Sequence, residues 1–188
     1  MITVNISFGS KTIIETLQDE KSKLVKEKNQ LGYKNSVKEI DNFIENISQN
    51  QKLSKTKIVR KIAAGSSAIV YETEDGDVLK LTRRSHYPLF RPQEDFDVPI
   101  KESGKAGEVH YYIEEKLFQH NLHSGFAKEI QEKIKNKGYK VYDFGSYGIH
   151  QIGMSKDGKI YLLDPECARY KTIFHALWNK LKNFFHKI

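Results

Sequence analysis

The sequence contains 188 residues, with only one cysteine and four prolines among them. A single cysteine, Cys167, excludes an internal disulfide framework and any zinc site built from several thiolates. No apolar run approaches the ~18 residues of a membrane-spanning helix, and the N-terminus shows no cleavable signal peptide. These absences predict a soluble protein without transmembrane segments.

Acidic residues are fewer than basic residues in this chain. The chain has 31 Lys and Arg against 24 Asp and Glu, a formal net charge of +7. This balance suits an anionic partner such as a nucleotide, a nucleic acid or an acidic membrane surface. Lysines scattered over solvated helices give the same total, and composition alone favours this second interpretation.

The first part of the chain is polar, with a narrow apolar stripe. Apolar residues recur there at helical spacing: Val37, Ile40, Phe43, Ile44 and Ile47. Residues 48–57, "SQNQKLSKTK", have the composition of a linker. We therefore predict a polar, helical N-terminal extension over residues 1–57 and a separate domain over residues 58–188.

Residues 58–82 predict β-strands. "KIVRKIAA" is followed by "GSSAIVYETEDGDVLKLT", in which the acidic turn around Gly76 separates two runs of β-branched and aromatic residues, as in a β-hairpin. Lys80 stands in the apolar run "VLKL" with Val78 as its alternation partner. If both side chains point inward, the Lys80 ammonium needs a partner.

The remainder alternates loops, helices and strands. Residues 83–105 hold three of the four prolines and predict a long loop. In this loop Arg83, Arg84 and Arg91 bracket aromatic residues, an arrangement able to hold a phosphate or a partner. The pattern after the loop predicts, in order, helices over 106–122 and 124–138, a strand at 139–144, a hairpin over 151–165 and an amphipathic helix over 172–188.

The order of these parts resembles that of a protein kinase. "GSSAIVY" resembles the glycine-rich loop, and Lys80 falls where the phosphate-binding lysine of kinases belongs. "DGKIYLLDP" resembles the strand pair that delivers the metal-binding aspartate, with Asp164-Pro165-Glu166 in place of Asp-Phe-Gly. The resemblance implies an α+β, protein kinase-like fold with a small β-sheet N-lobe, one regulatory-type helix and a heavily truncated helical C-lobe.

The resemblance also implies nucleotide-binding residues, with ATP and Mg²⁺ as cofactors. Gly65, Ser66 and Ser67 would let backbone N–H groups approach the phosphates. Lys80 would offer the phosphates a point charge, and Glu108 on the predicted helix would hold that lysine in place. Glu115 is the alternative helix glutamate.

The same resemblance implies which residues bind the metal and which residue acts as the base for the reacting hydroxyl. Asp164 would bind Mg²⁺, and Gln151 occupies the position of the second metal-binding residue of kinases. The catalytic His-Arg-Asp triplet is absent. Asp143 is then the candidate base, acting with Lys80 and Asp164 as the catalytic set, and His150 is its alternative.

The brevity of the chain resembles very small kinases that bacterial secretion systems inject into host cells. One such family, which this chain resembles in size and architecture, phosphorylates the host heat-shock-protein-ninety chaperone. The expectation is an ATP- and Mg²⁺-dependent serine/threonine kinase, a virulence effector acting on a protein substrate in the host cytoplasm. Residues 1–57 suit a secretion signal and chaperone-binding region; without secretion, the location would be the bacterial cytoplasm.

Two other classes of function remain open. A pseudokinase that binds a nucleotide or a partner without catalysis is favoured by the missing triplet and by Gln151. A basic nucleic-acid or membrane-surface binder is favoured by the net charge and by the final helix, which leaves peripheral membrane contact open. The aromatic stripe of that helix, which includes Trp178, Phe184 and Phe185, is more typical of a core, and nucleic acid is therefore not the expected partner.

Overall fold

A computed structural model describes residues 10–26, 33–65, 68–83, 91–145 and 148–170. The fold is of mixed α+β type, and the chain divides into two compact units. One unit comprises Met1–Arg84 and Lys101–Glu114, and the other comprises Ser85–Ile100 and Glu115–Ile188. Ser66, Ser67, Arg84 and the predicted C-terminal helix lie outside the described residues.

A six-stranded sheet forms the first unit, in the order β1-β2-β3-β4-β6-β5. Its strands are β1 (Lys11–Thr12), β2 (Lys57–Ala64), β3 (Ala68–Thr73), β4 (Val78–Thr82), β5 (Ile100–Ala106) and β6 (Val109–Glu114). β1 to β4 pair antiparallel in sequence order, and β6 pairs antiparallel with β4. The hairpin predicted around Gly76 is confirmed as the β3–β4 turn.

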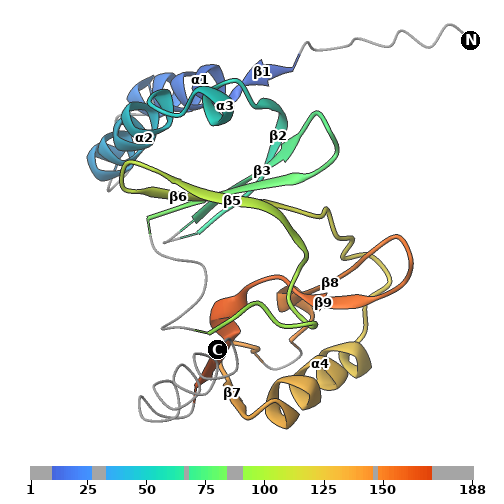
Figure 1. Cartoon of the computed structure of the whole chain (residues 1–188). Coiled ribbons are helices and arrows are strands. Elements are labelled where there is room, and N and C mark those ends of the chain that lie inside the picture. Colours follow the sequence, from blue (N-terminus) through green and yellow to red (C-terminus); the bar gives the residue numbers. More distant parts are fainter. Residues whose placement is uncertain (1–9, 27–32, 66–67, 84–90, 146–147, 171–188) are drawn as a thin grey trace, which may run out of the picture. The chain divides into compact units, whose positions relative to one another are not determined.

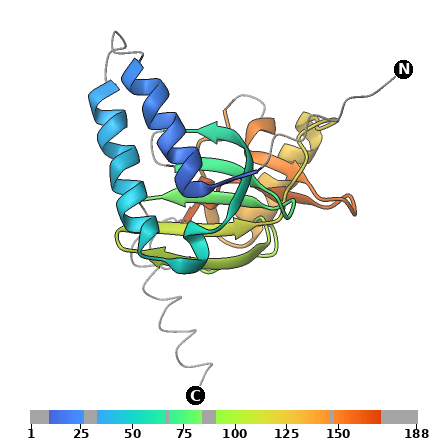
Figure 2. The ribbon, with the colours of Figure 1, turned by 90° about the horizontal axis from the view of Figure 1, so that it is seen from above.

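Helices cover one face of this sheet (Figures 1 and 2). They are α1 (Ile13–Lys26), α2 (Tyr33–Ser48) and the short α3 (Gln51–Ser54). The predicted helical stripe of α2 is confirmed, because Ile40, Phe43 and Ile47 are buried against the sheet. Burial of such side chains stabilises the unit by ~1.5–3 kcal/mol each.

The N-terminal helices are therefore part of the sheet unit. Ile13 and Leu17 of α1 share one hydrophobic core with Tyr71 and Leu79 of the sheet. The segment predicted as a linker, 48–57, contains α3, which Asn50 caps by accepting a hydrogen bond from the Leu53 N–H. The compact units consequently do not divide between residues 57 and 58.

The helix predicted over residues 106–122 is wrong. Residues 100–114 form strands β5 and β6, joined by a turn at Gly107 and Glu108, so the long loop predicted over 83–105 also ends at Ile100. β6 is buried on both faces, with Tyr111 on the helix side and Tyr112 on the other. An apolar run buried on both sides has no period of two, and periodicity cannot distinguish it from a helix.

The second unit is built on α4 (Ser124–Asn136), which confirms the helix predicted over 124–138. β8 (Ile152–Met154) and β9 (Ile160–Leu162) form the predicted hairpin. β7 (Tyr139–Val141) pairs antiparallel with β10 (Ala168–Tyr170). Two 3₁₀ helices, η1 (Ile149–Gln151) and η2 (Pro165–Cys167), flank the hairpin in sequence. The hydrophobic core of the second unit includes Phe96, Ile130, Ile134, Tyr139 and Leu162.

Across the described ranges, no helix has both the length and the apolar character needed to traverse a lipid bilayer.

Candidate functional site

Lys80 lies on the face of the sheet opposite to the helices. Its neighbours in β4, Leu79 and Leu81, are fully buried in the core beneath α1 and α2. Because side chains alternate along a strand, Lys80 and Val78 share the other face, outside this core. Both side chains are half-buried there.

The strand register places Lys80 between Val70 of β3 and Tyr112 of β6. Two residues along the same face, Val78 lies between Glu72 and Glu114. Both carboxylates are therefore diagonal cross-strand neighbours of Lys80, within the reach of long side chains. Glu114 is only 4% exposed.

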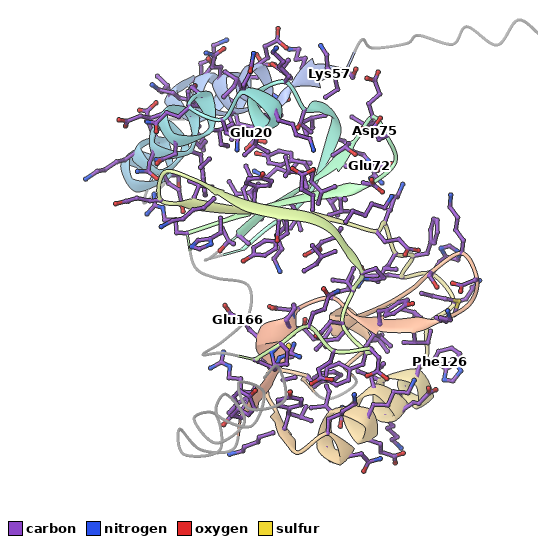
Figure 3. All side chains as sticks on the ribbon, in the orientation of Figure 1. Glu20, Lys57, Glu72, Asp75, Phe126 and Glu166 are labelled. Atoms are coloured by element: carbon purple, nitrogen blue, oxygen red, sulfur yellow. The ribbon has the colours of Figure 1, made fainter. Side chains whose placement is uncertain are left out.

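Glu72, labelled in Figure 3, also accepts a hydrogen bond from Arg60 Nε at 2.9 Å. At the other end of this face, Thr82 lies between Ala68 and His110. Burial, with a smaller contribution from Lys105, lowers the pKa of His110 below its ordinary value of 6.5. The face thus combines Lys80 with two carboxylates and a histidine that favours the neutral form.

Glu108 does not belong to this group. It lies in the β5–β6 turn, where its backbone N–H donates to Asn46 Oδ1 of α2 at 2.8 Å. It is four residues from Tyr112, the register partner of Lys80, which corresponds to about 13 Å along a strand. The assignment of Glu108 to Lys80 depended on the wrong helix and is corrected accordingly.

Glu115 is not on a helix either. It follows β6 and belongs to the second unit, where its backbone N–H donates to the Pro99 carbonyl at 2.9 Å. The glutamate that sequence reasoning missed is Glu114. The alternation His110, Tyr112, Glu114 would have placed it on the face of Lys80 if residues 109–114 had been assigned as a strand.

The glycine–serine turn begins at Gly65. The Gly65 N–H donates to the Ala68 carbonyl at 2.8 Å, which closes a tight connection between β2 and β3. A Cβ atom at Gly65 would meet only that carbonyl, at 4.0 Å. Ser66 and Ser67, the other predicted phosphate contacts, are among the residues that are not described.

Asp164 lies just after β9, as predicted, at the start of η2. It caps η2 by accepting a hydrogen bond from the Glu166 N–H at 3.0 Å, and its carbonyl accepts one from the Cys167 N–H at 2.9 Å. Pro165 occupies the first position of the turn, where no N–H is needed. The half-buried Asp164 carboxylate is thus fixed at the end of a strand (Glu166 marks this turn in Figure 3).

Gln151 connects two of the predicted site segments. Its side-chain Nε2 donates to the carbonyl of Asp143 at 3.1 Å, and its own carbonyl accepts from the Leu163 N–H at 2.8 Å. Leu163 directly precedes Asp164. The second unit therefore brings together the segments of Asp143, Gln151 and Asp164 through two hydrogen bonds.

Asp143 has φ +50°, in the left-handed region that aspartate tolerates better than most residues. Its side chain is exposed. His150, the alternative base, is also exposed, and its carbonyl accepts a hydrogen bond from Gln119 Nε2 at 3.2 Å. Exposure leaves both candidates open to a substrate hydroxyl.

A pair of cations flanks Tyr142, the residue before Asp143. Lys140 Nζ and Arg169 Cζ each lie 5.2 Å from the centroid of the Tyr142 ring. Lys140 and Arg169 are direct cross-strand partners on β7 and β10, and Arg169 also bonds Glu166. Two cations therefore flank the residue before Asp143, and one of them is paired with Glu166.

The sequence suggested that Arg91 holds a phosphate or a partner from an open loop, but the structure places it elsewhere. It is 3% exposed and forms a two-fold ion pair with Asp97. The prediction for Arg91 is therefore wrong. The basic character of the segment does not reveal that Asp97, six residues later, forms a buried ion pair with the arginine.

The described part of the chain contains no group of three or more His, Cys, Asp or Glu side chains able to hold a metal ion. Asp164 and Gln151, the two predicted ligands, lie on segments that the hydrogen bond from the Leu163 N–H to the Gln151 carbonyl joins. No protein-family model matches the chain, and no curated protein matches it either.

Proposed function

We propose that the protein is an atypical, minimal protein kinase-like enzyme that transfers the γ-phosphoryl group of ATP to a hydroxyl group of a protein. The position of Lys80 is the main support. It lies on the third strand of the β2–β3–β4 meander, whose first connection is the glycine–serine turn after Gly65. In protein kinases a glycine-rich loop covers the phosphates, and the phosphate-binding lysine is on the third strand.

The turn after β9 supports the same proposal. Mg²⁺ prefers carboxylate and carbonyl oxygens, and Asp164 and Gln151 supply one of each from the same unit. The hydrogen bond between Gln151 and Leu163 ties the two residues together. Asp164 and Gln151 would hold a magnesium ion in this proposal, and the ion would neutralise phosphate charge when bound.

Asp143 would orient the attacking hydroxyl. In the transfer, the substrate oxygen forms a bond to the γ-phosphorus, the bond to the leaving ADP oxygen breaks, and the hydroxyl proton passes to the Asp143 carboxylate. The Gln151 side chain holds the Asp143 backbone in its left-handed conformation. The positive pair Lys140 and Arg169 favours an acidic stretch of the substrate next to Asp143.

The substrate class that we propose is a host protein, and the heat-shock-protein-ninety chaperone is the first to test. Delivery into host cells by a secretion system belongs to the same proposal. It is supported by the resemblance of "GSSAIVYE" to small effector kinases.

A nucleotide-binding pseudokinase is the second candidate. Gln151 favours it, because its amide donates to the Asp143 carbonyl and could brace the loop without binding a metal. The structure also leaves the predicted Lys80–Glu108 pair without support. Binding of Mg-ATP without phosphate transfer would select this candidate.

Radiolabelled ATP distinguishes the two candidates. The protein is incubated with eukaryotic cell extract and, separately, with the purified chaperone, and label in protein is counted. Asp164→Ala should abolish the transfer and weaken Mg²⁺-dependent nucleotide binding, and Lys80→Ala should abolish the transfer with the fold intact by circular dichroism. Full transfer by Asp164→Ala would refute the kinase proposal.

The base is tested by Asp143→Ala. A general base contributes about 10²–10⁴-fold to a rate, so we expect a loss in this range with nucleotide affinity near that of the wild type. A fully active Asp143→Ala protein would pass the role to His150 or to solvent.

A further inference from the structure

A buried ion pair lies in the second unit beside the Asp164 turn. Arg91 Nη1 donates to Asp97 Oδ2 at 2.8 Å, and Arg91 Nη2 donates to Asp97 Oδ1 at 2.7 Å. Both side chains are 0% exposed. Asp97 Oδ2 also accepts the Glu94 N–H at 2.7 Å, so the carboxylate is held by its own segment as well.

The same guanidinium reaches the residue after Asp164. Arg91 Nη2 donates to the carbonyl of Pro165 at 3.2 Å, across 74 positions of sequence. The rings of Phe96 and Tyr139 hold the guanidinium, with centroids 5.5 and 5.4 Å from its central carbon. Such a planar fork can serve Asp97 and Pro165 at once, which a lysine ammonium cannot do with the same geometry.

The segment that carries this pair also binds β9. Asp97 and Leu162 form a parallel β-bridge. The Leu162 N–H donates to the Phe96 carbonyl at 2.6 Å, and the Val98 N–H donates to the Leu162 carbonyl at 2.9 Å. Residues 91–98 therefore hold the strand before Asp164 through their backbone and the turn after it through Arg91.

Stability alone is a poor explanation for this arrangement. A buried ion pair must recover the cost of removing two charges from water, and well-packed apolar residues often stabilise a core equally well. What an apolar pair could not supply is the hydrogen bond to the Pro165 carbonyl, which fixes the backbone next to Asp164.

We propose that Arg91 is a positioning residue, which Asp97 orients and which holds the Asp164 turn in the geometry needed to bind a divalent cation. The role of Arg91 in cation binding rests on the proposed function, whereas its hold on the turn does not. Arg91 acts through the backbone at Pro165 and needs no contact with the nucleotide or with the metal.

The test compares the full-length wild type with two variants. Arg91→Lys keeps a positive charge beside Asp97 but loses the fork that spans Asp97 and Pro165. The double variant Arg91→Met with Asp97→Leu removes both charges, so that neither is left buried alone. Tyr139→Phe is the matched control, because it removes a hydrogen bond to Glu94 (2.5 Å) from the same cluster and leaves the ring beside Arg91 in place.

The first measurement is amide hydrogen exchange, which needs no ligand. The Glu166 and Cys167 amides bond within the Asp164 turn, so we expect them to exchange about tenfold faster or more in both variants. The Ile130 amide, inside α4, should be unchanged. Wild-type exchange at both turn amides in both variants, or equal acceleration by Tyr139→Phe, would overturn the proposal.

The second measurement is a titration with MgCl₂ at fixed ATP concentration. Residues that support a metal ligand typically contribute 10–100-fold to metal affinity, and we expect a weakening in about this range with metal-free ATP affinity unchanged. Unchanged Mg²⁺ affinity in both variants would overturn the role of Arg91 in cation binding. If the wild type binds no Mg-ATP, the proposed function fails, while the exchange measurement still decides whether Arg91 holds the turn.

Discussion

Lys80 and Asp164, the two residues on which the functional proposal depends most, are positioned in different ways. Lys80 is placed by the register of a regular sheet, where its face and its cross-strand neighbours follow from alternation. Asp164 lies between a three-residue strand and a 3₁₀ turn, and contacts with distant parts of the sequence define its surroundings. A regular element thus places a charged group through local pattern, whereas an irregular one needs specific side chains to fix it.

Ion pairs in the two units also differ in how deeply they are buried. In the sheet unit, the pairs Lys101–Asp77 and Lys21–Asp41 each have at least one well-exposed partner. In the second unit, Arg91 and Asp97 are completely enclosed. Exposed pairs contribute ~0–1 kcal/mol, while breaking a buried pair on one side leaves a charge without compensation.

The largest expected effect follows from this difference. Arg91→Ala should lower the free energy of unfolding of the second unit by about 3–5 kcal/mol, because it leaves Asp97 buried and charged. Urea unfolding followed by probes in that unit measures it. Lys133→Ala is the control, since Lys133 pairs with Glu129 on the surface of α4 and should cost only ~0.3–0.5 kcal/mol. Similar losses in the two variants would remove the contrast between the buried pair and an exposed one.

The next effect concerns the β5–β6 turn, which replaced the predicted helix. Gly107 has φ +56°, and a Cβ atom there would come within 1.7 Å of Asn46 Oδ1. Gly107→Ala should therefore destabilise the sheet unit by about 2–3 kcal/mol, combining left-handed strain with a disturbed hydrogen bond to Glu108.

Gly76→Ala provides the matched control for this turn. Gly76 has φ +80° in the β3–β4 turn, but no atom lies within 4 Å of its added Cβ. Only the backbone term should remain, about 1 kcal/mol. Equal melting temperatures for the two variants would show that Asn46 does not anchor the β5–β6 turn.

Much of the fold could be predicted because it follows local patterns. The β3–β4 and β8–β9 hairpins, α2 and α4 were all readable from turn residues and apolar periodicity. β6 was not, since its two buried faces remove the alternation that identifies a strand. That single error displaced the candidate partner of Lys80 from Glu114 to Glu108.

The candidate site was less predictable than the fold. Asp164 could be located because it ends a hairpin, but the bond from Gln151 to the Asp143 carbonyl depends on backbone conformation that no residue type specifies. Arg91 lies in a segment without periodicity, and its partners Asp97 and Pro165 come together only in the folded unit. From sequence composition alone, such an arginine is predicted to lie exposed in a loop.

A glutamine scan sharpens the comparison on the sheet side. Glu114→Gln should weaken Mg-ATP binding by about tenfold, because it removes a carboxylate charge from the face of Lys80. Glu108→Gln, in the turn, should bind as the wild type does. Nucleotide affinity measured by calorimetry on both variants gives the answer, and a larger loss for Glu108→Gln would restore the original assignment.

The smallest expected effect is a pH dependence at the other end of this face, where His110 adjoins Thr82. Burial, and then the charge of Lys105, lowers the pKa of His110, so the unfolded chain takes up its proton at a higher pH than the folded one. The stability of the folded protein therefore decreases as the pH falls below the ordinary histidine pKa near 6.5, until His110 of the folded protein is protonated too.

His110→Gln removes this pH-dependent contribution to stability and keeps a polar side chain of similar reach. The melting temperature of the wild type should fall faster than that of His110→Gln between about pH 7 and pH 5.5, a window set by the ordinary histidine pKa. Because the carboxylates titrate alike in both proteins, the difference between the two curves isolates His110, and parallel curves would mean that this face does not discriminate against its charged form.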